Sequence, residues 1–351
     1  MNDLRILPPT VDLESKPVLK QCLAARAALA ELRLAVRLLS EPAVLKPLLR
    51  LEATHSFAID GMAVGPTSPQ AGAYEHALNH GFATLAEAPL SICLAATLCR
   101  LLSTAGRDCG LALSASASRE PAALYLSPHQ RALLDNWERF LAEPGELDPV
   151  VRMAVQHYQL QAIHAFGDAS GRTGRVVSVL CLIQDKVLDF PSLNLSRFLL
   201  ANRDSYARLF SRVAAGEWEP WLLYMLEATT AASAWSSRKI HAIRALMAAT
   251  AAHIRAQAPR LYSRQLVELI FIEPYCRIGN LVASGIAERH GASTLLKELV
   301  RLDVLVEERR WRDKIFLNRT YLDLICSDDS AAPPSPGLVV CAASVSRVPS
   351  P

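Results

Sequence analysis

Apolar residues recur every three to four positions along most of this chain, which is the spacing of helices with one buried face. Prolines and glycines interrupt the pattern and divide it into segments. The segments predicted to be helical are 17–39, 43–54, 73–104, 128–142, a stretch that begins at Pro149, 196–213, and 216 to beyond 234. We therefore expect a mainly α fold.

Two parts of the chain depart from this pattern. Residues 106–125 are rich in Ser, Ala and Gly and have no helical period, so a hairpin or an irregular flap is expected there. From residue 261 on, short helices at 264–271, 278–285 and 291–302 precede two β-like runs, 304–307 and 314–317. Three helices followed by a two-stranded wing predict a winged helix-turn-helix.

Composition narrows the class of protein. The chain has 351 residues, a formal net charge of +3 and 51% hydrophobic residues, and it contains no long uncharged apolar run that would predict a membrane span. The charge alone does not argue for nucleic acid. The N-terminus has no signal-peptide layout, and the eight cysteines form no CxxC pair. These features predict a reduced, cytoplasmic protein, with a disordered Pro/Ser-rich tail over 327–351.

The candidate chemistry is concentrated in residues 164–175, between two apolar helical segments. This stretch holds one imidazole, one carboxylate, glycines and two guanidinium groups, in His164, Asp168, Arg172 and Arg175. A loop of small residues that leads into a helix N-terminus presents free backbone N–H groups and the positive end of the helix dipole. The two arginines are three positions apart, so they can share one face of the first turn. The stretch is therefore interpreted as a phosphate-binding loop with a base and a metal-ligating carboxylate.

The same stretch resembles the signature of the Fic family, His-Pro-Phe-x-(Asp/Glu)-Gly-Asn-Gly-Arg-x-x-Arg. His164, Phe166, Asp168, Gly171, Arg172 and Arg175 match it, whereas Ala165, Ala169 and Ser170 replace Pro, Gly and Asn. Farther away, Leu49 to Ala53, Ser56-x-x-x-Asp60-Gly61 and Gly216-x-Trp218-Glu219-x-Trp221 are similar to family segments. The resemblance covers residues 5–325.

The resemblance implies a Fic-type helical core with a small β-hairpin flap and a C-terminal winged helix-turn-helix. The implied boundaries are 1–72 for an N-terminal region with an inhibitory helix, 73–235 for the catalytic core, 236–326 for the winged helix and 327–351 for the tail. Family members most often transfer AMP from ATP to a protein hydroxyl. The implied co-substrate and cofactor are ATP and Mg²⁺, and the implied partner is a target protein with a Tyr, Thr or Ser hydroxyl.

The resemblance also implies a role for each motif residue. His164 would be the general base, and Asp168 would hold Mg²⁺. The phosphate site would comprise Gly167, Asp168, Ala169, Ser170, Gly171, Arg172 and Arg175, with Tyr206 near the adenine. The plainer readings are a hydrogen-bonded histidine, an N-cap aspartate, a solvated arginine face and a core tyrosine.

The three departures predict reduced or retuned transfer. If residue 169 needs a positive φ, Ala169 costs about 1–2 kcal/mol relative to Gly. Ser170 lacks the amide of Asn, and Ala165 does not fix the turn into the loop as Pro would.

The segment Ser56-x-x-x-Asp60-Gly61 resembles the family's inhibitory pattern, in which an acid pairs with the second motif arginine, here Arg175. Asp60 stands where the family has Glu and is one methylene shorter, so its reach is in question, and a surface carboxylate before a helix C-cap is the alternative. Gly61 is expected to end the helix.

The leading hypothesis is Mg²⁺/ATP-dependent protein AMP transfer, autoinhibited in cis. The alternatives are a catalytically weakened nucleotide-binding Fic module that acts as a DNA-binding regulator through its winged helix, residues 264–318, and a Fic enzyme that transfers another phosphate-containing group. DNA contact stays open, because acids near the wing offset its cations. Homodimerisation is also left open.

Overall fold

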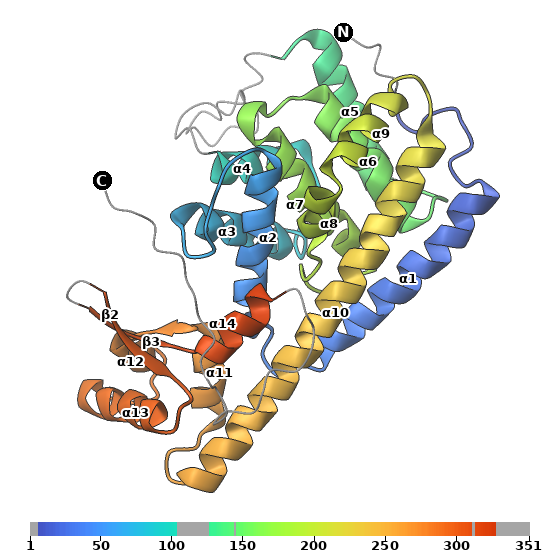
Figure 1. The fold of residues 1–351 in the computed structure, drawn as a ribbon. Helices are drawn as coiled ribbons and strands as arrows, with labels where there is room; N and C mark the ends of the chain where they lie inside the picture. Colours follow the sequence, from blue (N-terminus) through green and yellow to red (C-terminus); the bar gives the residue numbers. More distant parts are fainter. Residues whose placement is uncertain (1–5, 104–125, 144, 311–312, 328–351) are drawn as a thin grey trace. The chain divides into compact units, whose positions relative to one another are not determined.

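The computed structural model describes residues 6–103, 126–143, 145–310 and 313–327. The chain divides into two compact units, Met1–Ile240 and His241–Pro351, and the long helix α10 (Trp218–Gln257) contributes to both. The described residues are mainly helical, as expected (Figure 1). Among them, no helix is both long enough and apolar enough to cross a bilayer.

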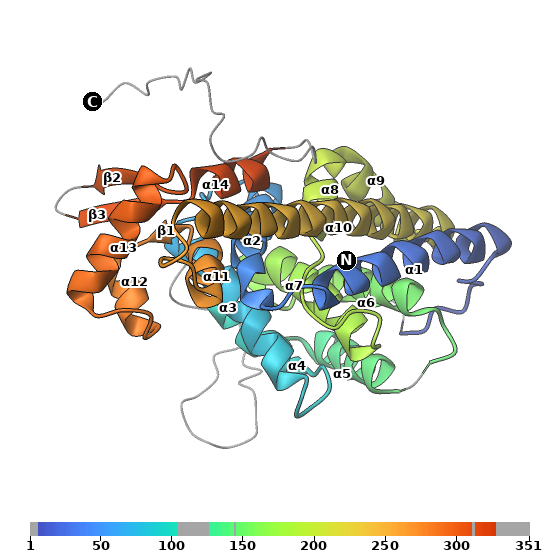
Figure 2. The same ribbon diagram turned by 90° about the horizontal axis from the view of Figure 1, so that it is seen from below.

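Two adjacent helices, α6 (Pro149–Ile163) and α7 (Ser170–Gln184), form the centre of the first unit. Nearly every residue of both helices is buried, because they are surrounded by the other helices (Figures 1 and 2). Asp148 caps α6 by accepting the N–H of Val150, and Pro149 takes the first turn, as expected. The loop that joins α6 to α7 is the motif, so the candidate site is built on the best-packed part of the unit.

Smaller helices cover this central pair. The bounds are α3 (Pro69–Thr84), α4 (Ile92–Leu102), α5 (Pro128–Ala142), α8 (Leu195–Ala201) and α9 (Arg203–Val213). The helix expected over 128–142 is confirmed, whereas the one expected over 73–104 is two helices with a break between them. The helix expected over 196–213 is interrupted at Asn202, which ends α8 and precedes α9. The flap expected over 106–125 and most of the tail lie outside the described residues.

Helix α2 (Lys46–Ile59), preceded by the 3₁₀ turn η1 (Pro42–Leu45), packs against α3, α7 and α8. It runs five residues beyond the end expected at 54, so Ser56 lies inside it and Asp60 is its C-cap. Gly61 has φ +83°, and the N–H groups of Gly61 and Met62 donate to the carbonyls of Ala58 and Phe57. These are the two bonds of a Schellman motif, which needs the left-handed residue that glycine supplies without strain.

Helix α1 (Lys16–Arg37) is apolar on two sides, which corrects the expectation of a one-sided helix. Its inner side is buried and follows a heptad spacing, with Val18, Cys22, Ala25, Leu29, Leu32 and Val36. Its outer side exposes four leucines, at 19, 23, 34 and 38. A helix that is apolar around much of its circumference is ordinarily buried, and we return to this outer side below.

The described residues of the second unit form, after α10, four short helices and a three-stranded antiparallel sheet of order β1-β3-β2. The elements are α11 (Arg264–Ile272), β1 (Tyr275–Cys276), α12 (Ile278–Ala283), α13 (Arg289–Arg301), β2 (Val306–Arg310), β3 (Asp313–Leu317) and α14 (Arg319–Cys326). In register, Glu308 pairs with Ile315 and Tyr275 with Leu317. The expected order of three helices and two strands is present. The strand expected over 304–307 is present but begins two residues later, because Val304 and Leu305 are buried residues that precede β2. Neither β1 nor α14 was expected from the sequence pattern.

Cys22, Cys93, Cys181, Cys276 and Cys326 are free.

Candidate functional site

The motif loop begins where α6 ends. His164 is the C-cap of α6 in a left-handed conformation, φ 50° and ψ 40°, and its side chain is exposed. The next two residues are buried, Phe166 completely and Ala165 almost completely. The chain then passes through the short 3₁₀ helix η2 (Gly167–Ala169) into α7. Gly167 also has a positive φ, +55°. The loop therefore directs one imidazole outward while an aromatic side chain anchors it inside.

Two of the three replaced motif residues, Ala169 and Ser170, have unstrained backbone conformations. Ala169 has φ −95° and ψ 1°, so the condition under which alanine would be costly here is not met. Ser170 is buried, and its hydroxyl oxygen accepts the N–H of Phe166 at 3.1 Å. The Ser170 hydroxyl therefore joins the start of α7 to Phe166 in the loop, which keeps the turn closed without the amide of Asn.

Arg172 is fully buried and all of its guanidinium nitrogens have partners. Nη1 donates to Oδ2 of Asp60 at 2.7 Å, Nη2 to Oδ2 of Asp168 at 3.3 Å, and Nε to the carbonyl of Leu102 at 3.3 Å. The ring of Phe57 lies 4.8 Å from the guanidinium carbon. Arg172 is thus held by groups from α2, α4 and the motif loop at once.

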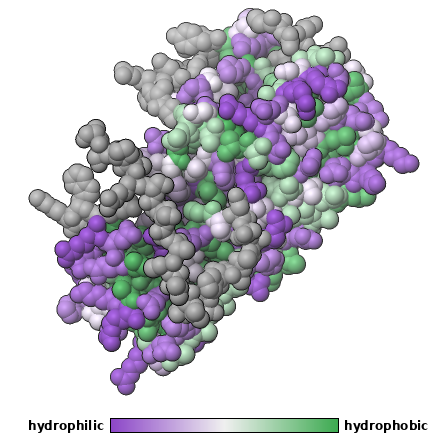
Figure 3. Space-filling view, in the orientation of Figure 1, coloured by the Kyte–Doolittle hydropathy of each residue, from purple (hydrophilic) through white to green (hydrophobic). Residues whose placement is uncertain are grey.

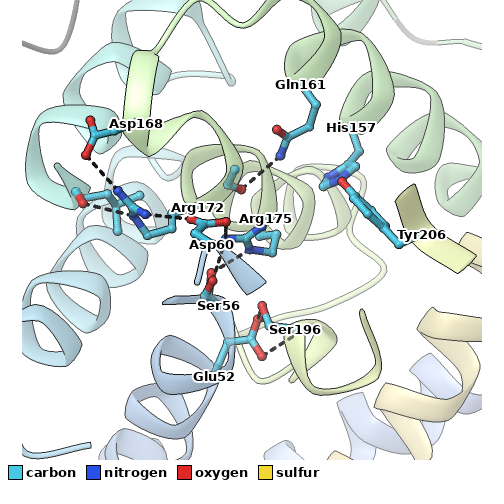
Figure 4. A network of polar contacts seen from close by, with 12 residues as sticks. Glu52, Ser56, Asp60, His157, Gln161, Asp168, Arg172, Arg175, Ser196 and Tyr206 are labelled. Carbon is cyan, nitrogen blue, oxygen red and sulfur yellow. Dashed lines mark hydrogen bonds and ion pairs between the residues drawn. The ribbon is translucent and has the colours of Figure 1, made fainter. Parts of the chain in front are cut away.

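Arg175 is bound by the last turn of α2. Its Nε donates to Oγ of Ser56 at 2.7 Å, and Nη2 donates to the carbonyl of Ser56 at 2.8 Å and to Oδ1 of Asp60 at 2.9 Å. The aspartate therefore reaches both motif arginines, one with each oxygen (Figure 4). Its side chain is 19% exposed, whereas those of the arginines are 0% and 3% exposed.

Gly171 is the residue that lets the aspartate approach so closely. A Cβ atom at position 171 would lie 2.8 Å from Oδ1 of Asp60 and 3.1 Å from Nη1 of Arg175. Gly174 is similarly constrained, because a Cβ there would lie 2.5 Å from Nε2 of Gln161, which donates to the carbonyl of Gly171. Both glycines are needed for packing, since neither has a positive φ.

Asp168 is the carboxylate that could hold a metal. Its side chain is 44% exposed, and besides Arg172 it accepts a long hydrogen bond from Ser103 at 3.4 Å. Within the described ranges, no group of three or more His, Cys, Asp or Glu side chains converges. A lone carboxylate such as Asp168 could contribute one ligand to Mg²⁺, which typically takes one or two carboxylates and completes its shell with phosphates and water.

Glu52, two turns before Asp60 on the same face of α2, is almost entirely buried. Its carboxylate accepts the backbone N–H of Ser196 at 3.0 Å and the hydroxyl of Ser196 at 2.5 Å. Burial raises the pKa of Glu52 to about 8, although the two Ser196 donors and Arg175 act in the opposite direction. This contact fixes α2 to α8 (Figure 4).

A buried chain of hydrogen bonds lies behind the loop. Ser178 donates to the carbonyl of Gly174, so it accepts from Nδ1 of His157, and Nε2 of His157 is left to accept the hydroxyl of Tyr206 at 2.9 Å. Burial and the positive charge of Arg175 lower the pKa of His157 to about 3, so its ring is neutral. Tyr206 also lies in an aromatic cluster with Phe210, Trp221 and Tyr224, and burial raises its pKa to about 12.

The structure thus brings Ser56, Asp60, Asp168, Arg172 and Arg175 into one network. Glu52 and His157 were missed as site residues by sequence reasoning. The spacing of Glu52, Ser56 and Asp60 at i, i+4 and i+8 was the available signal for the first. No signal marks the second, because its partner Tyr206 is 49 residues away.

Two sequence-family models match the chain. Residues 106–182 match the Fic/DOC family, and residues 246–321 match the C-terminal domain of SoFic-like protein adenylyltransferases. The first match includes the whole motif loop, and the second covers most of the described residues of the second unit.

Solved structures also resemble the chain at low identity. A Fic family protein from Desulfovibrio desulfuricans is 14% identical with a TM-score of 0.49, and the match covers 88% of this chain and 97% of that one. Two structures of a Fic-1 fragment from C. elegans are 17% and 19% identical, with TM-scores of 0.44 and 0.45. They cover 62% and 65% of this chain and 72% and 73% of theirs.

Proposed function

Because these matches identify a Fic/DOC family protein with a SoFic-like C-terminal domain, we propose that it transfers AMP from Mg²⁺-bound ATP to a hydroxyl of a target protein. We further propose that α2 inhibits this transfer in cis. Members of the Fic family typically AMPylate proteins, and the present chain keeps the base, the acid and both arginines of the motif.

In this proposal His164 removes the proton from the attacking Tyr, Thr or Ser hydroxyl. Its exposed position beyond the end of α6 leaves the ring accessible to a second protein. The hydroxyl oxygen then bonds to the α-phosphorus as the bond to the β-phosphate oxygen breaks, and pyrophosphate leaves. Backbone N–H groups at the start of α7 and the two arginines stabilise the charge on the phosphates.

Asp168 would hold Mg²⁺ at the exposed side of the loop. Bound there, the ion would neutralise phosphate charge. To accept a nucleotide in this way, Arg172 and Arg175 must both exchange a carboxylate for phosphate oxygens.

The observation that carries the proposed inhibition is the double contact of Asp60. One carboxylate binds both arginines, at 2.7 and 2.9 Å, in a setting where the guanidinium groups are buried. A phosphate and this carboxylate compete for the same donors, since each is an anion suited to the planar guanidinium fork. Occupation by Asp60 therefore disfavours productive ATP binding.

The test uses ATP labelled at the α- or the γ-phosphate with wild type, Asp60→Gly and His164→Ala. We expect Asp60→Gly to raise self-labelling from the α-position at least tenfold, and His164→Ala to abolish it. Asp60→Asn tests whether charge or shape matters, because the amide keeps the volume but cannot accept two charge-assisted bonds as well. Asp189→Asn, which alters an ion pair on the far side of the unit near α1, is the matched control.

Three results would contradict the proposal in different ways. Label only from the γ-phosphate would indicate transfer of a bare phosphate. Binding of ATP without any label would indicate a nucleotide-binding module. Unchanged activity in Asp60→Gly would show that α2 does not inhibit the transfer, while the proposed transferase activity itself would stand.

We also propose that residues 264–317 act as a winged helix with a packing role rather than as a DNA reader. Three of its cations are engaged by neighbouring acids: Arg301 by Glu298, Lys314 by Glu307 and Arg264 by Glu268. DNA affinity needs several cations free for phosphates on one face. Binding of duplex DNA that is still measurable at 150 mM salt and weakens as the salt concentration is raised would overturn this assignment.

A further inference from the structure

The outer side of α1 carries an apolar stripe made of Leu19, Leu23, Ala27, Ala30, Leu34 and Leu38, referred to here as the outer stripe. All six residues are exposed, and the leucines expose 46%, 74%, 57% and 48% of their surface in chain order. Figures 1 and 2 both place α1 at the outside of the first unit, and Figure 3 shows apolar residues at that edge. Because the opposite side of α1 already packs against the unit, the outer stripe needs a partner from elsewhere.

The spacing of the outer stripe is 4-4-3-4-4, which repeats every eleven residues. An eleven-residue repeat corresponds to 3.67 residues per turn, close to the 3.6 of a straight helix. The stripe therefore stays on one side of α1 for five turns, where scattered surface leucines would spiral around it. Ala27 and Ala30 lie in the middle, so a second helix can approach closely there, with a pair of leucines on either side.

The charges beside the stripe select the partner. Arg26 and Glu31 flank it on opposite sides and are five residues apart. In a parallel pair of identical helices, a residue on one flank meets the residue five positions later on the other helix. Arg26 of each copy then faces Glu31 of the other, which gives two ion pairs per dimer. In an antiparallel pair, residues on the same flank meet, so Arg26 and Glu31, which lie on opposite flanks, do not face each other and the two ion pairs are not made.

Both side chains are available for this contact. Arg26 is 46% exposed and makes only a long contact of 3.8 Å with Asp148. Glu31 is exposed and has no ion pair within the described part of the chain.

We propose that the outer stripe is a dimer interface in which α1 packs in parallel against α1 of a second copy of this chain. Like residues meet at the stripe, Leu23 against Leu23 and Leu34 against Leu34, with the alanines between them. A single helix pair is smaller than the roughly 800 Å² per partner of a standard interface, so we expect a weak dimer with a dissociation constant on the order of micromolar. The proposal is independent of the transfer activity.

The first experiment measures the mass of the full chain by sedimentation equilibrium between 1 and 200 μM. We expect a shift from 38.3 kDa to twice that mass as concentration rises. Leu23→Glu combined with Leu34→Glu should weaken the dimer at least 100-fold. Val282→Glu is the matched control, because Val282 is 44% exposed in the second unit and outside the stripe. Circular dichroism establishes that each variant stays folded.

The second experiment tests the orientation by charge exchange. Arg26→Glu and Glu31→Arg should each raise the dissociation constant at least fivefold, and the double variant should restore it. A chain that stays monomeric at 200 μM, or a dimer that survives the leucine variants, overturns the proposal. Failure of the double variant to recover refutes the parallel arrangement. Binding of the monomer to anionic phospholipid vesicles, lost in the leucine variants, would instead assign the stripe to a membrane surface.

Discussion

Glu52 offers a quantitative test of the contact between α2 and α8, because it is a buried acid whose carboxylate accepts the main-chain N–H and the hydroxyl of Ser196. The perturbation is Glu52→Gln, which keeps the size of the side chain and an oxygen that can accept both Ser196 hydrogens. It removes only the ability to ionise. The variant therefore isolates the cost of charging this position.

The sign follows from the pKa. In the unfolded chain the pKa of Glu52 is near its ordinary value of 4.5, and in the folded protein it is raised to about 8. The folded state thus holds a proton that the unfolded state releases, so stability is fully present below pH 4.5 and is lost as the pH rises toward 8. Between pH 6 and pH 8 the folded protein loses about 2 kcal/mol of unfolding free energy on this account. Glutamine does not lose it.

The assay is urea denaturation at pH 6 and pH 8, followed by circular dichroism. The difference in unfolding free energy between Glu52→Gln and wild type should increase by about 2 kcal/mol over this range. Glu75→Gln is the control, because Glu75 pairs with Arg50 and should show no such pH-dependent gain. A pH-independent difference for Glu52→Gln would show that Glu52 is ionised throughout and that its bonds to Ser196 are charge-assisted.

Three further substitutions test the loop. Gly171→Ala should displace Asp60, because its Cβ would lie 2.8 Å from Oδ1 of that residue. We expect AMP transfer to rise severalfold while the unfolding free energy falls by about 1–3 kcal/mol. A lower unfolding free energy without any rise in transfer would show that the position of Asp60 does not control transfer. Ala169→Gly should lower the unfolding free energy by about 0.5–1 kcal/mol without raising transfer, because φ is −95° there; a large gain in labelling would mean that the reaction needs a conformation absent from this structure. Tyr206→Phe should lower the unfolding free energy by about 1–3 kcal/mol, since Nε2 of buried His157 loses its donor; an unchanged urea midpoint would show that another donor replaces the hydroxyl.

The elements of the site with a local cause could be predicted from the sequence. The loop between α6 and α7, the placement of both arginines near the start of α7 and the left-handed turn at Gly61 all follow from glycine placement and residue spacing within a few positions. The contact of Asp60 with Arg172 could not be predicted, because it depends on how α2 packs on α7, more than one hundred residues away. The harmless conformation of Ala169 likewise became clear only from its dihedral angles.

The errors in the fold have the same origin. The extension of α2 by five residues is stabilised by partners on other helices, through Ser56 and Phe57, and periodicity does not register such partners. Strand β1 is two residues long and exists because β3 offers it an edge. The outer stripe of α1 was overlooked for the opposite reason: an Ala/Leu-rich helix satisfies a helical period on more than one side.

The three acceptors on one face of α2 indicate how the proposed inhibition would be relieved. Glu52 binds α8, Ser56 binds Arg175 and Asp60 binds both arginines, so α2 is held at three successive turns. Glu52 and Ser56 are buried, whereas Asp60 is partly exposed and lies at the C-cap. The next residue, Gly61, borders open space, because a Cβ atom added to it would have no neighbouring atom within 4 Å. Displacing the whole helix would break all of these contacts, including the hydrogen bonds of the buried Glu52 carboxylate to Ser196. Rotating only the Asp60 side chain and the Gly61 turn would free both arginines while Glu52 and Ser56 keep α2 in place. Relief of inhibition is therefore expected to be a local event at the end of α2, and hydrogen exchange in the active Asp60→Gly variant should increase at residues 58–62 but not at 46–54.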